Sequence, residues 1–332
     1  MTKLLKNRAF FAALLCAAAT APSFAQVKWD LATGYPDSSF HVKNLREFAA
    51  DVSSRTAGQV QITVHSGGSL VKAPDIRQAV IDGTLAMGEV FGPSLSAVHP
   101  VFGLDAIPFF STSYASSRNL WNLSRPLAEK KIAEKGVSLL YSVPWPPQGL
   151  FSQKKIRQAS DLKGIKLREN SPAVKRVATS LGAEPVNVET PELAAAVISG
   201  KVEAVFTSAA QGVDTKMSQT LKWFYPLNAW LPRNAVIMNS KKLAELTAPQ
   251  REAVVRASGA AEERGWTLSQ QNAIETLKLL EDSGAKIGTI DSTLRSRLDR
   301  AATEVVSGMI TNADPELLTV MSKFMAQGSA KK

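Results

Sequence analysis

The chain has 332 residues, of which 45% are hydrophobic and 20% are charged, and its formal net charge is +10. This hydrophobic fraction excludes a disordered chain, and the length predicts two domains because a single core rarely serves more than about 300 residues. The cations are dispersed rather than clustered, which argues against nucleic-acid binding. We therefore expect a globular protein whose positive charge attracts small anions.

Residues 1–25 have the pattern of a secretory signal peptide. Basic residues precede an apolar run at 9–19, and the small residues Ser23 and Ala25 fit a cleavage site after Ala25. The run is too short for a transmembrane helix, which needs about 20 apolar residues. The only cysteine, Cys16, lies in this leader, so the mature chain would have no disulfide and no cysteine nucleophile. We expect export to the periplasm without membrane insertion.

The mature chain opens with alternating strand-like and helix-like segments. Residues 27–33 and 60–65 have strand patterns, whereas 42–55 and 74–82 have helical patterns. This order predicts a largely parallel sheet with helices on its faces, and such sheets bind ligands beyond the carboxyl ends of their strands. We therefore expect binding residues directly after strands.

A short repeat relates the two halves of the chain. Residues 79–85 (AVIDGTL) return as 196–202 (AVISGKV), and each copy ends a predicted helix at a glycine that precedes an apolar strand. Counting eight residues beyond each glycine reaches Phe91 and Ser208, which would face one another across a cleft. A repeat of this length is also compatible with a common way of ending a helix.

A long helix is predicted to follow Thr247. Thr247 and Gln250 form a capping-box pattern, and the sequence then favours a helix as far as residue 281. At 1.5 Å per residue such a helix is about 50 Å long, so we expect it to cross both domains. Gly259 and Gly265 are either bends or glycines that the helix tolerates.

The sequence lacks the motifs of metal and nucleotide chemistry. His41, His65 and His99 lie in unrelated segments, and there is no HExxH, CxxC, GxGxxG, GxxxxGK[ST] or GxSxG motif. We expect no metal, no cofactor and no catalysis. An enzyme acting on small acids would need an acid/base pair such as Glu89 with Glu203, and this is the rival interpretation from another class.

Arg168 is the main candidate for ligand binding. It ends a short predicted strand that follows a turn at 160–164. Its guanidinium can form two parallel charge-assisted hydrogen bonds to a carboxylate, which a lysine does not reproduce. From chemistry alone, a lone arginine is more often part of a surface ion pair.

Seven segments resemble, in order, those of the substrate-binding proteins of tripartite ATP-independent periplasmic (TRAP) transporters, the DctP-like family. The resemblance covers essentially the whole mature chain. It implies two α/β domains that close on a small carboxylate, and delivery of this ligand to the membrane subunits of a TRAP permease. It also implies that Arg168 binds the carboxylate. The segments are 48–49, 56–60, 68–70, 81–85, 107–110, 161–168 and 200–204.

The chain departs from the sugar-acid-binding members of that family at three positions. Those members often have an arginine at the site of Gln148, an acid at the site of Phe91 and an asparagine at the site of Ser208. These replacements favour a more apolar pocket beside Trp145, unless that tryptophan packs a hinge. We expect an aromatic or apolar monocarboxylate, such as an aryl 2-oxo or 2-hydroxy acid, with a C4-dicarboxylate, a sugar acid or a small hydroxy acid as alternatives.

The predicted binding residues divide into polar and aromatic groups. The guanidinium would bind the carboxylate of the ligand, and a glutamine and two hydroxyls would hydrogen-bond to a neighbouring oxo or hydroxyl oxygen. Aromatic rings would form the rest of the pocket wall. The complete set is Arg168, Gln148, Ser208, Thr207, Phe91, Trp145, Trp230, Phe110 and Tyr35.

The predicted fold is that of a two-lobed α/β periplasmic binding protein, similar to type II. Lobe I would comprise 26–145 and 234–272, lobe II would comprise 146–233 and 273–332, and the hinge would lie where the chain crosses between them. We expect a monomer or a weak dimer. A receptor for an ATP-driven importer and a ligand-sensing partner of a signalling receptor remain as further alternatives.

Overall fold

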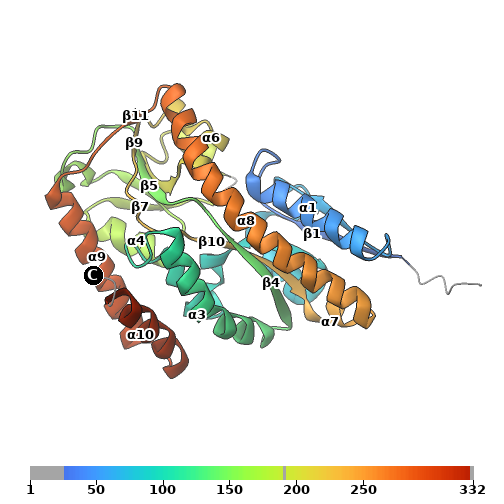
Figure 1. The fold of residues 1–332 in the computed structure, drawn as a ribbon. Coiled ribbons are helices and arrows are strands. Elements are labelled where there is room, and N and C mark those ends of the chain that lie inside the picture. The colour runs from blue at the N-terminus through green and yellow to red at the C-terminus, as the bar shows by residue number, and fades with distance from the viewer. Residues whose placement is uncertain (1–25, 190–191, 330–332) are drawn as a thin grey trace, which may run out of the picture.

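The computed structural model describes residues 26–189 and 192–329, and the predicted signal peptide lies outside them. It has two β-sheets flanked by helices (Figure 1). The predicted two-lobed α/β fold is confirmed. The division of the chain into the two lobes stays a prediction.

The first sheet has the strand order β2-β1-β3-β10-β4. Strand β1 runs parallel to β2 and β3, whereas β10 is antiparallel to both β3 and β4. The parallel strands are linked by helices α1 and α2, as the alternating sequence pattern predicts. The elements of this part are β1 (Val27–Ala32), α1 (Phe40–Arg55), β2 (Val60–His65), α2 (Ala73–Asp82), β3 (Met87–Phe91), η1 (Gly92–Ala97), η2 (Pro100–Ala106), α3 (Tyr114–Ala133), β4 (Val137–Pro144), β10 (Arg233–Asn239) and α7 (Ser240–Ala244).

The second sheet has the strand order β11-β9-β5-β8-β6-β7. Strands β6, β7 and β8 are parallel, and β5 is antiparallel to β8 and β9. The elements of this part are β5 (Gln148–Ser152), η3 (Ala159–Leu162), β6 (Lys166–Glu169), α4 (Pro172–Ser180), β7 (Glu184–Asn187), α5 (Leu193–Ile198), β8 (Ala204–Ser208), α6 (Ala209–Asp214), η5 (Met217–Gln219), β9 (Trp223–Tyr225) and β11 (Lys286–Ile287).

The chain passes between the sheets after β4 and again after β9. These two crossings lie side by side, because Trp145 N donates to Pro232 O at 2.8 Å and Gln148 N donates to Trp230 O at 2.9 Å. Both crossings fall near the residues at which the sequence predicts the hinge. Backbone hydrogen bonds between them satisfy polar groups that would otherwise be buried without partners.

The repeated sequence has the same structure in both copies. Gly83 follows helix α2 and Gly200 follows helix α5, with φ angles of 76° and 72°. Residues with a side chain rarely adopt this left-handed conformation. A strand follows each of them, and Phe91 and Ser208 are the last residues of β3 and β8. The shared motif therefore ends a helix and starts a central strand in each sheet.

Helix α8 (Ala248–Asp282) is a single helix of 35 residues that packs against elements of both sheets (Figure 1). Its capping box has both predicted hydrogen bonds between Thr247 and Gln250. Gly265 lies where α8 packs closely against β4 and α1. A Cβ at this position would collide with the side chain of Val143 and lie 2.9 Å from Asn44 Nδ2. Close packing explains this glycine better than a bend.

Two further helices, α9 (Ser292–Thr311) and α10 (Pro315–Ser329), complete the described chain. Helix α9 packs against α4, whereas α10 packs against α3 beside the first sheet (Figure 1). His99 Nε2 lies 2.7 Å from Asp314 Oδ2 at the junction of the two helices. The segment that the sequence places wholly in lobe II therefore also contacts elements of the first sheet.

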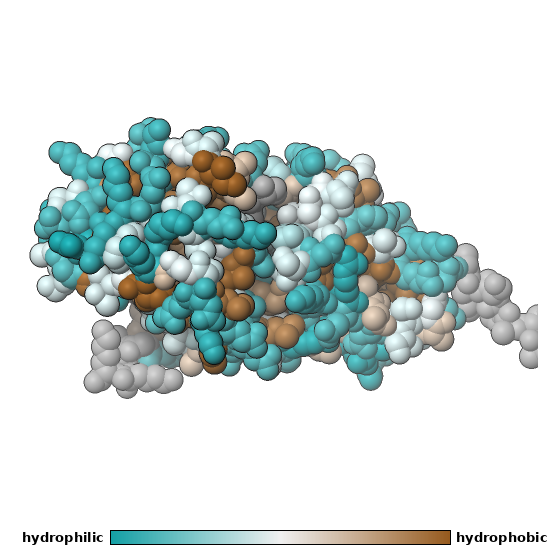
Figure 2. Space-filling model, turned by 90° about the horizontal axis from the view of Figure 1, so that it is seen from above, coloured by the Kyte–Doolittle hydropathy of each residue, from teal (hydrophilic) through white to brown (hydrophobic). Residues whose placement is uncertain are grey.

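Polar side chains cover most of the face shown in Figure 2, and apolar atoms form small separate groups between them. This distribution is ordinary for a folded protein surface. Among the helices of residues 26–189 and 192–329, none has the length and apolar character needed to span a membrane.

Candidate functional site

A cavity of about 230 Å³ lies where strands of the two sheets end, and we call it the Arg168 cavity. Strand β6 supplies Arg168 from the second sheet, and strand β3 supplies Glu89 and Phe91 from the first. Its position beyond strand ends is the one expected for ligand sites in α/β folds. The lining residues are Gly34, Tyr35, Ala73, Pro74, Arg77, Glu89, Val90, Phe91, Ser94, Arg168, Asn170 and Glu189.

Arg168 supplies a buried positive charge to this cavity. Its side chain is only 3% exposed, and Nε donates to the carbonyl oxygen of Val188 at 2.9 Å. Burial lowers the pKa of Arg168 to about 10, although the electrostatic effects of Tyr35 and Glu189 act in the opposite direction. The guanidinium therefore stays protonated at neutral pH and is oriented by the backbone.

Glu89 supplies a buried negative charge to the same cavity from the first sheet. Thr33 Oγ1 donates to Oε2 at 2.6 Å, Asn234 Nδ2 donates to Oε1 at 2.9 Å, and His41 Nδ1 lies 3.2 Å from Oε1. Burial raises the pKa of Glu89, but the hydrogen bond and charge of His41 and the hydrogen bonds from Thr33 and Asn234 outweigh it, so the pKa lies below its ordinary value. The carboxylate is ionised at neutral pH.

The amide of Asn234 connects Glu89 to two aromatic side chains. Its Oδ1 accepts from Tyr35 Oη at 3.2 Å and from Trp145 Nε1 at 2.9 Å. The rings of Tyr35 and Trp145 are also in contact, with centroids 5.1 Å apart. Buried hydrogen bonds of this kind fix side-chain positions, so the Glu89 carboxylate is held rigidly.

The family profile described as bacterial extracellular solute-binding protein, family 7 (DctP), matches residues 31–312. The chain belongs to this family. It is a solute-binding protein of the TRAP transporter type and not an enzyme, as the resemblance implies.

Solved structures show the same fold in related solute-binding proteins. DctP6 of Bordetella pertussis, described as a receptor binding pyroglutamic acid, is 38% identical over 90% of this chain and 100% of that chain, with a TM-score of 0.88. A TRAP protein from a marine metagenome, described as specific for pyroglutamate, is 30% identical over 91% and 100% of the chains, with a TM-score of 0.88. A galacturonate-bound protein from Sulfitobacter is 19% identical over 90% and 99%, with a TM-score of 0.82, and shows the fold alone.

Three of the predicted binding residues of this solute-binding protein line the Arg168 cavity, namely Arg168, Phe91 and Tyr35. Trp145 lies behind the cavity wall and reaches it through Asn234. It also packs against His41, with ring centroids 4.3 Å apart. The tryptophan thus combines a packing role with a hydrogen bond to the site.

The other five predicted residues lie outside this cavity. Gln148 Nε2 donates to Pro146 O, and Gln148 and its neighbour Gly149 pair with Ser208 and Thr207 in the β5–β8 register. Ser208 Oγ accepts from Gln211 N at 3.2 Å and so caps helix α6. The ring of Trp230 packs against that of Phe206, and the ring of Phe110 packs against that of Phe324. A role of these five residues in ligand binding stays a prediction.

Sequence reasoning missed Glu89 as a binding residue and considered it only as a catalytic partner of Glu203. Glu203 Oε2 instead accepts from Lys166 N at 3.1 Å and does not line the cavity. The sequence does hold a signal for Glu89, since an acid in the middle of a short apolar strand needs buried partners. Asn170 and Glu189 also line the cavity, but no sequence pattern marks them as binding residues.

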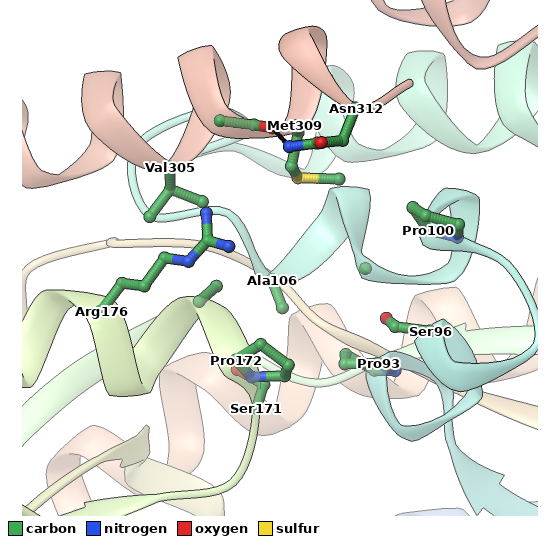
Figure 3. Close-up of a pocket in the computed structure, with 13 residues that line it drawn as sticks. Pro93, Ser96, Pro100, Ala106, Ser171, Pro172, Arg176, Val305, Met309 and Asn312 are labelled. Atoms are coloured by element: carbon green, nitrogen blue, oxygen red, sulfur yellow. Dashed lines mark hydrogen bonds between the residues drawn. The ribbon is translucent and has the colours of Figure 1, made fainter. Parts of the chain in front are cut away.

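A second cavity of about 230 Å³ lies between η1 and η2 on one side and α4 and α9 on the other (Figure 3). Arg176 extends along one wall, and Met309 points into the cavity from α9. The described residues that line it are mostly apolar and include none of those lining the Arg168 cavity.

Within residues 26–189 and 192–329 there is no group of three or more His, Cys, Asp or Glu residues that could hold a metal ion.

Proposed function

We propose that this protein binds a small cyclic monocarboxylate bearing an N–H group, of the pyroglutamate type, and delivers it to a TRAP permease. The observation that carries the proposal is the pair of buried opposite charges, Arg168 and Glu89, which strands of the two sheets bring to one small cavity. The two pyroglutamate-binding relatives named above, at 38% and 30% identity, support it.

The carboxylate of the solute belongs at Arg168. A guanidinium offers planar, parallel donors that match a carboxylate, and its burial strengthens the interaction because little solvent screens it. The carboxylate also compensates for removing this cation from water. This assignment agrees with the role that the family resemblance implies for Arg168.

An N–H donor of the solute belongs at Glu89. An ionised carboxylate has about four acceptor sites. Thr33, His41 and Asn234 occupy three of them, and two of these three contacts are on Oε1. One acceptor site on Oε2 is therefore available to the solute. A lactam N–H would satisfy it.

The charge of Glu89 makes the aryl 2-oxo acid expected from the sequence a poorer candidate. An oxo oxygen is only an acceptor and would repel a buried carboxylate, and the second carboxylate of a dicarboxylate would repel it more strongly. The cavity of about 230 Å³ is also smaller than the roughly 300–1,000 Å³ of pockets for drug-sized ligands. A compact lactam acid agrees with both features.

The location and partner follow from the family. Family 7 proteins are extracellular solute-binding proteins, which agrees with the signal peptide predicted at residues 1–25. We propose that the mature receptor captures its solute outside the cytoplasm and passes it to the membrane subunits of a TRAP transporter. The ligand stabilises the closed lobes by the extra affinity it has for them.

Isothermal titration calorimetry of the mature chain tests the proposal. The protein is first unfolded and refolded to remove any solute retained from the cells. We expect pyroglutamate to bind with micromolar or tighter affinity, and phenylpyruvate, succinate and galacturonate to bind at least about a hundredfold more weakly. Tighter binding of phenylpyruvate or galacturonate would show that the solute class is wrong.

A further inference from the structure

We infer that Asn234 is a specificity-determining residue, which holds the Glu89 carboxylate as a pure hydrogen-bond acceptor and so makes the receptor select a ring N–H over a ring oxygen. Asn234 does not line the cavity and acts through Glu89. The inference rests on the proposed function, because it concerns the group that Glu89 would bind.

The orientation of the Asn234 amide is fixed by the chemistry of its neighbours. The indole N–H of Trp145 is only a donor, so the atom that it contacts at 2.9 Å must be the amide oxygen. Tyr35 Oη donates to the same oxygen at 3.2 Å. The NH₂ group therefore points the other way, toward Glu89 Oε1 at 2.9 Å, and a flipped amide would break all three contacts.

The groups around Glu89 favour its ionised form. Asn234 presents an NH₂ group, which is not an acceptor, and His41 Nδ1 must carry a proton to donate to Oε1. If Glu89 were protonated at Oε1, its own hydrogen would point at the donors of Asn234 and His41, and the hydrogen bonds from these donors would be lost. Replacing the Asn234 donor by an acceptor, or removing it, therefore allows Glu89 to carry a proton and to act as a hydrogen-bond donor to a solute.

An acceptor-only carboxylate discriminates sharply between two ligands of almost the same shape. Pyroglutamate presents a ring N–H, whereas its lactone analogue presents an oxygen at that position. The lactone would place an acceptor against the Glu89 anion in a buried site, with no water to separate them. Sites built around a hydrogen bond reject such analogues strongly, so we expect a preference for the lactam of about a hundredfold or more.

Other charged and titratable groups that act on Glu89 keep their state near neutral pH. Burial raises the pKa of both Tyr35 and Tyr141, and the charge of Glu89 adds to this effect, so both phenols stay neutral. Arg168 stays protonated, since its pKa is about 10. His41 is the remaining neighbour, with its Nδ1 3.2 Å from Glu89 Oε1.

The test is the variant Asn234→Asp, in which the amide is replaced by a carboxyl group of the same shape. Two carboxyl groups in contact share a proton, because one of the two pKa values is strongly raised. Wild-type affinities are measured at the same pH values, between about 5.5 and 7.5, so that effects common to both proteins cancel. In Asn234→Asp the preference for the lactam should fall at least tenfold and become pH-dependent, because the shared proton can be donated to the lactone oxygen.

Two further variants keep the test decisive if Asn234→Asp folds poorly. Trp145→Phe removes the donor that orients the amide, and we expect a smaller loss of the preference without a new pH dependence. Thr33→Val removes a different donor to Glu89. It should lower the affinity for both ligands and leave the preference for the lactam over the lactone unchanged. If Asn234→Asp and Trp145→Phe both prefer the lactam over the lactone as strongly as the wild type does, the inference is wrong. If the wild type binds pyroglutamate no better than its lactone analogue or succinate, the proposed function itself fails.

Discussion

At the scale of single residues, the Arg168 cavity is built on buried charges whose partners are far apart in sequence. Arg168 is held by the backbone at Val188, whereas Glu89 is held by side chains from three other elements. Burial makes each charge costly unless it is paired or bound to a solute.

Substitutions at Arg168 should separate charge from geometry. We expect Arg168→Gln to weaken pyroglutamate binding by about 2–5 kcal/mol, because it leaves the solute carboxylate buried without its cation. Arg168→Lys should recover only part of this loss, since a lysine lacks the planar fork. Calorimetry measures both, with Arg176→Gln as the control, because Arg176 is an exposed cation that lines the other cavity. Unchanged affinity in Arg168→Gln would contradict the assignment.

The family-like segment is what drew attention to Arg168 in the sequence, whereas the charged residue Glu89 was not recognised as a binding residue. Arg168 and the aromatic residues Phe91 and Tyr35 line the cavity, as expected. Trp230 and Phe110 could not be judged in the same way, because an aromatic ring near a strand end packs equally well in a core or in a cleft. The structure places both rings in contact with Phe206 and Phe324.

At the scale of elements, local signals predict boundaries well where they specify hydrogen bonds. Strand β2 covers the predicted 60–65, and α8 begins at the predicted capping box. Helix-ending glycines were equally informative, since Gly83 has a left-handed conformation that other residues rarely adopt. The antiparallel placement of β10 could not be predicted, because it depends on a long-range return of the chain to the first sheet.

Two glycines of helix α8 make a matched pair for a stability test. A Cβ at Gly265 would collide with Val143, so we expect Gly265→Ala to destabilise the protein by about 1–3 kcal/mol. Gly259 has nothing within 4 Å of its Cβ position, so Gly259→Ala should be stabilising by about 0.5–1 kcal/mol. Urea unfolding followed by circular dichroism measures both values. Equal effects of the two changes would show that α8 does not pack against β4 as described.

At the scale of the whole molecule, the cavity exists because two separately built sheets meet at their strand ends. The chain crosses between the sheets three times, after β4, after β9 and along α8, and α8 packs against α1 and β4 on one side and against α6 on the other. Alternating strand and helix patterns predict each sheet, but they do not specify how one sheet faces the other. This is why the sequence placed Arg168 and Phe91 at strand ends but did not place Glu89 with them in one cavity.

A crystal structure of the refolded mature receptor with pyroglutamate tests the central claim most directly. We predict the solute carboxylate within hydrogen-bonding distance of Arg168, about 2.7–2.9 Å, and the ring N–H directed at Glu89 Oε2. Density for the solute in the cavity between α4 and α9, or a ring oriented with its carbonyl toward Glu89, would contradict the account.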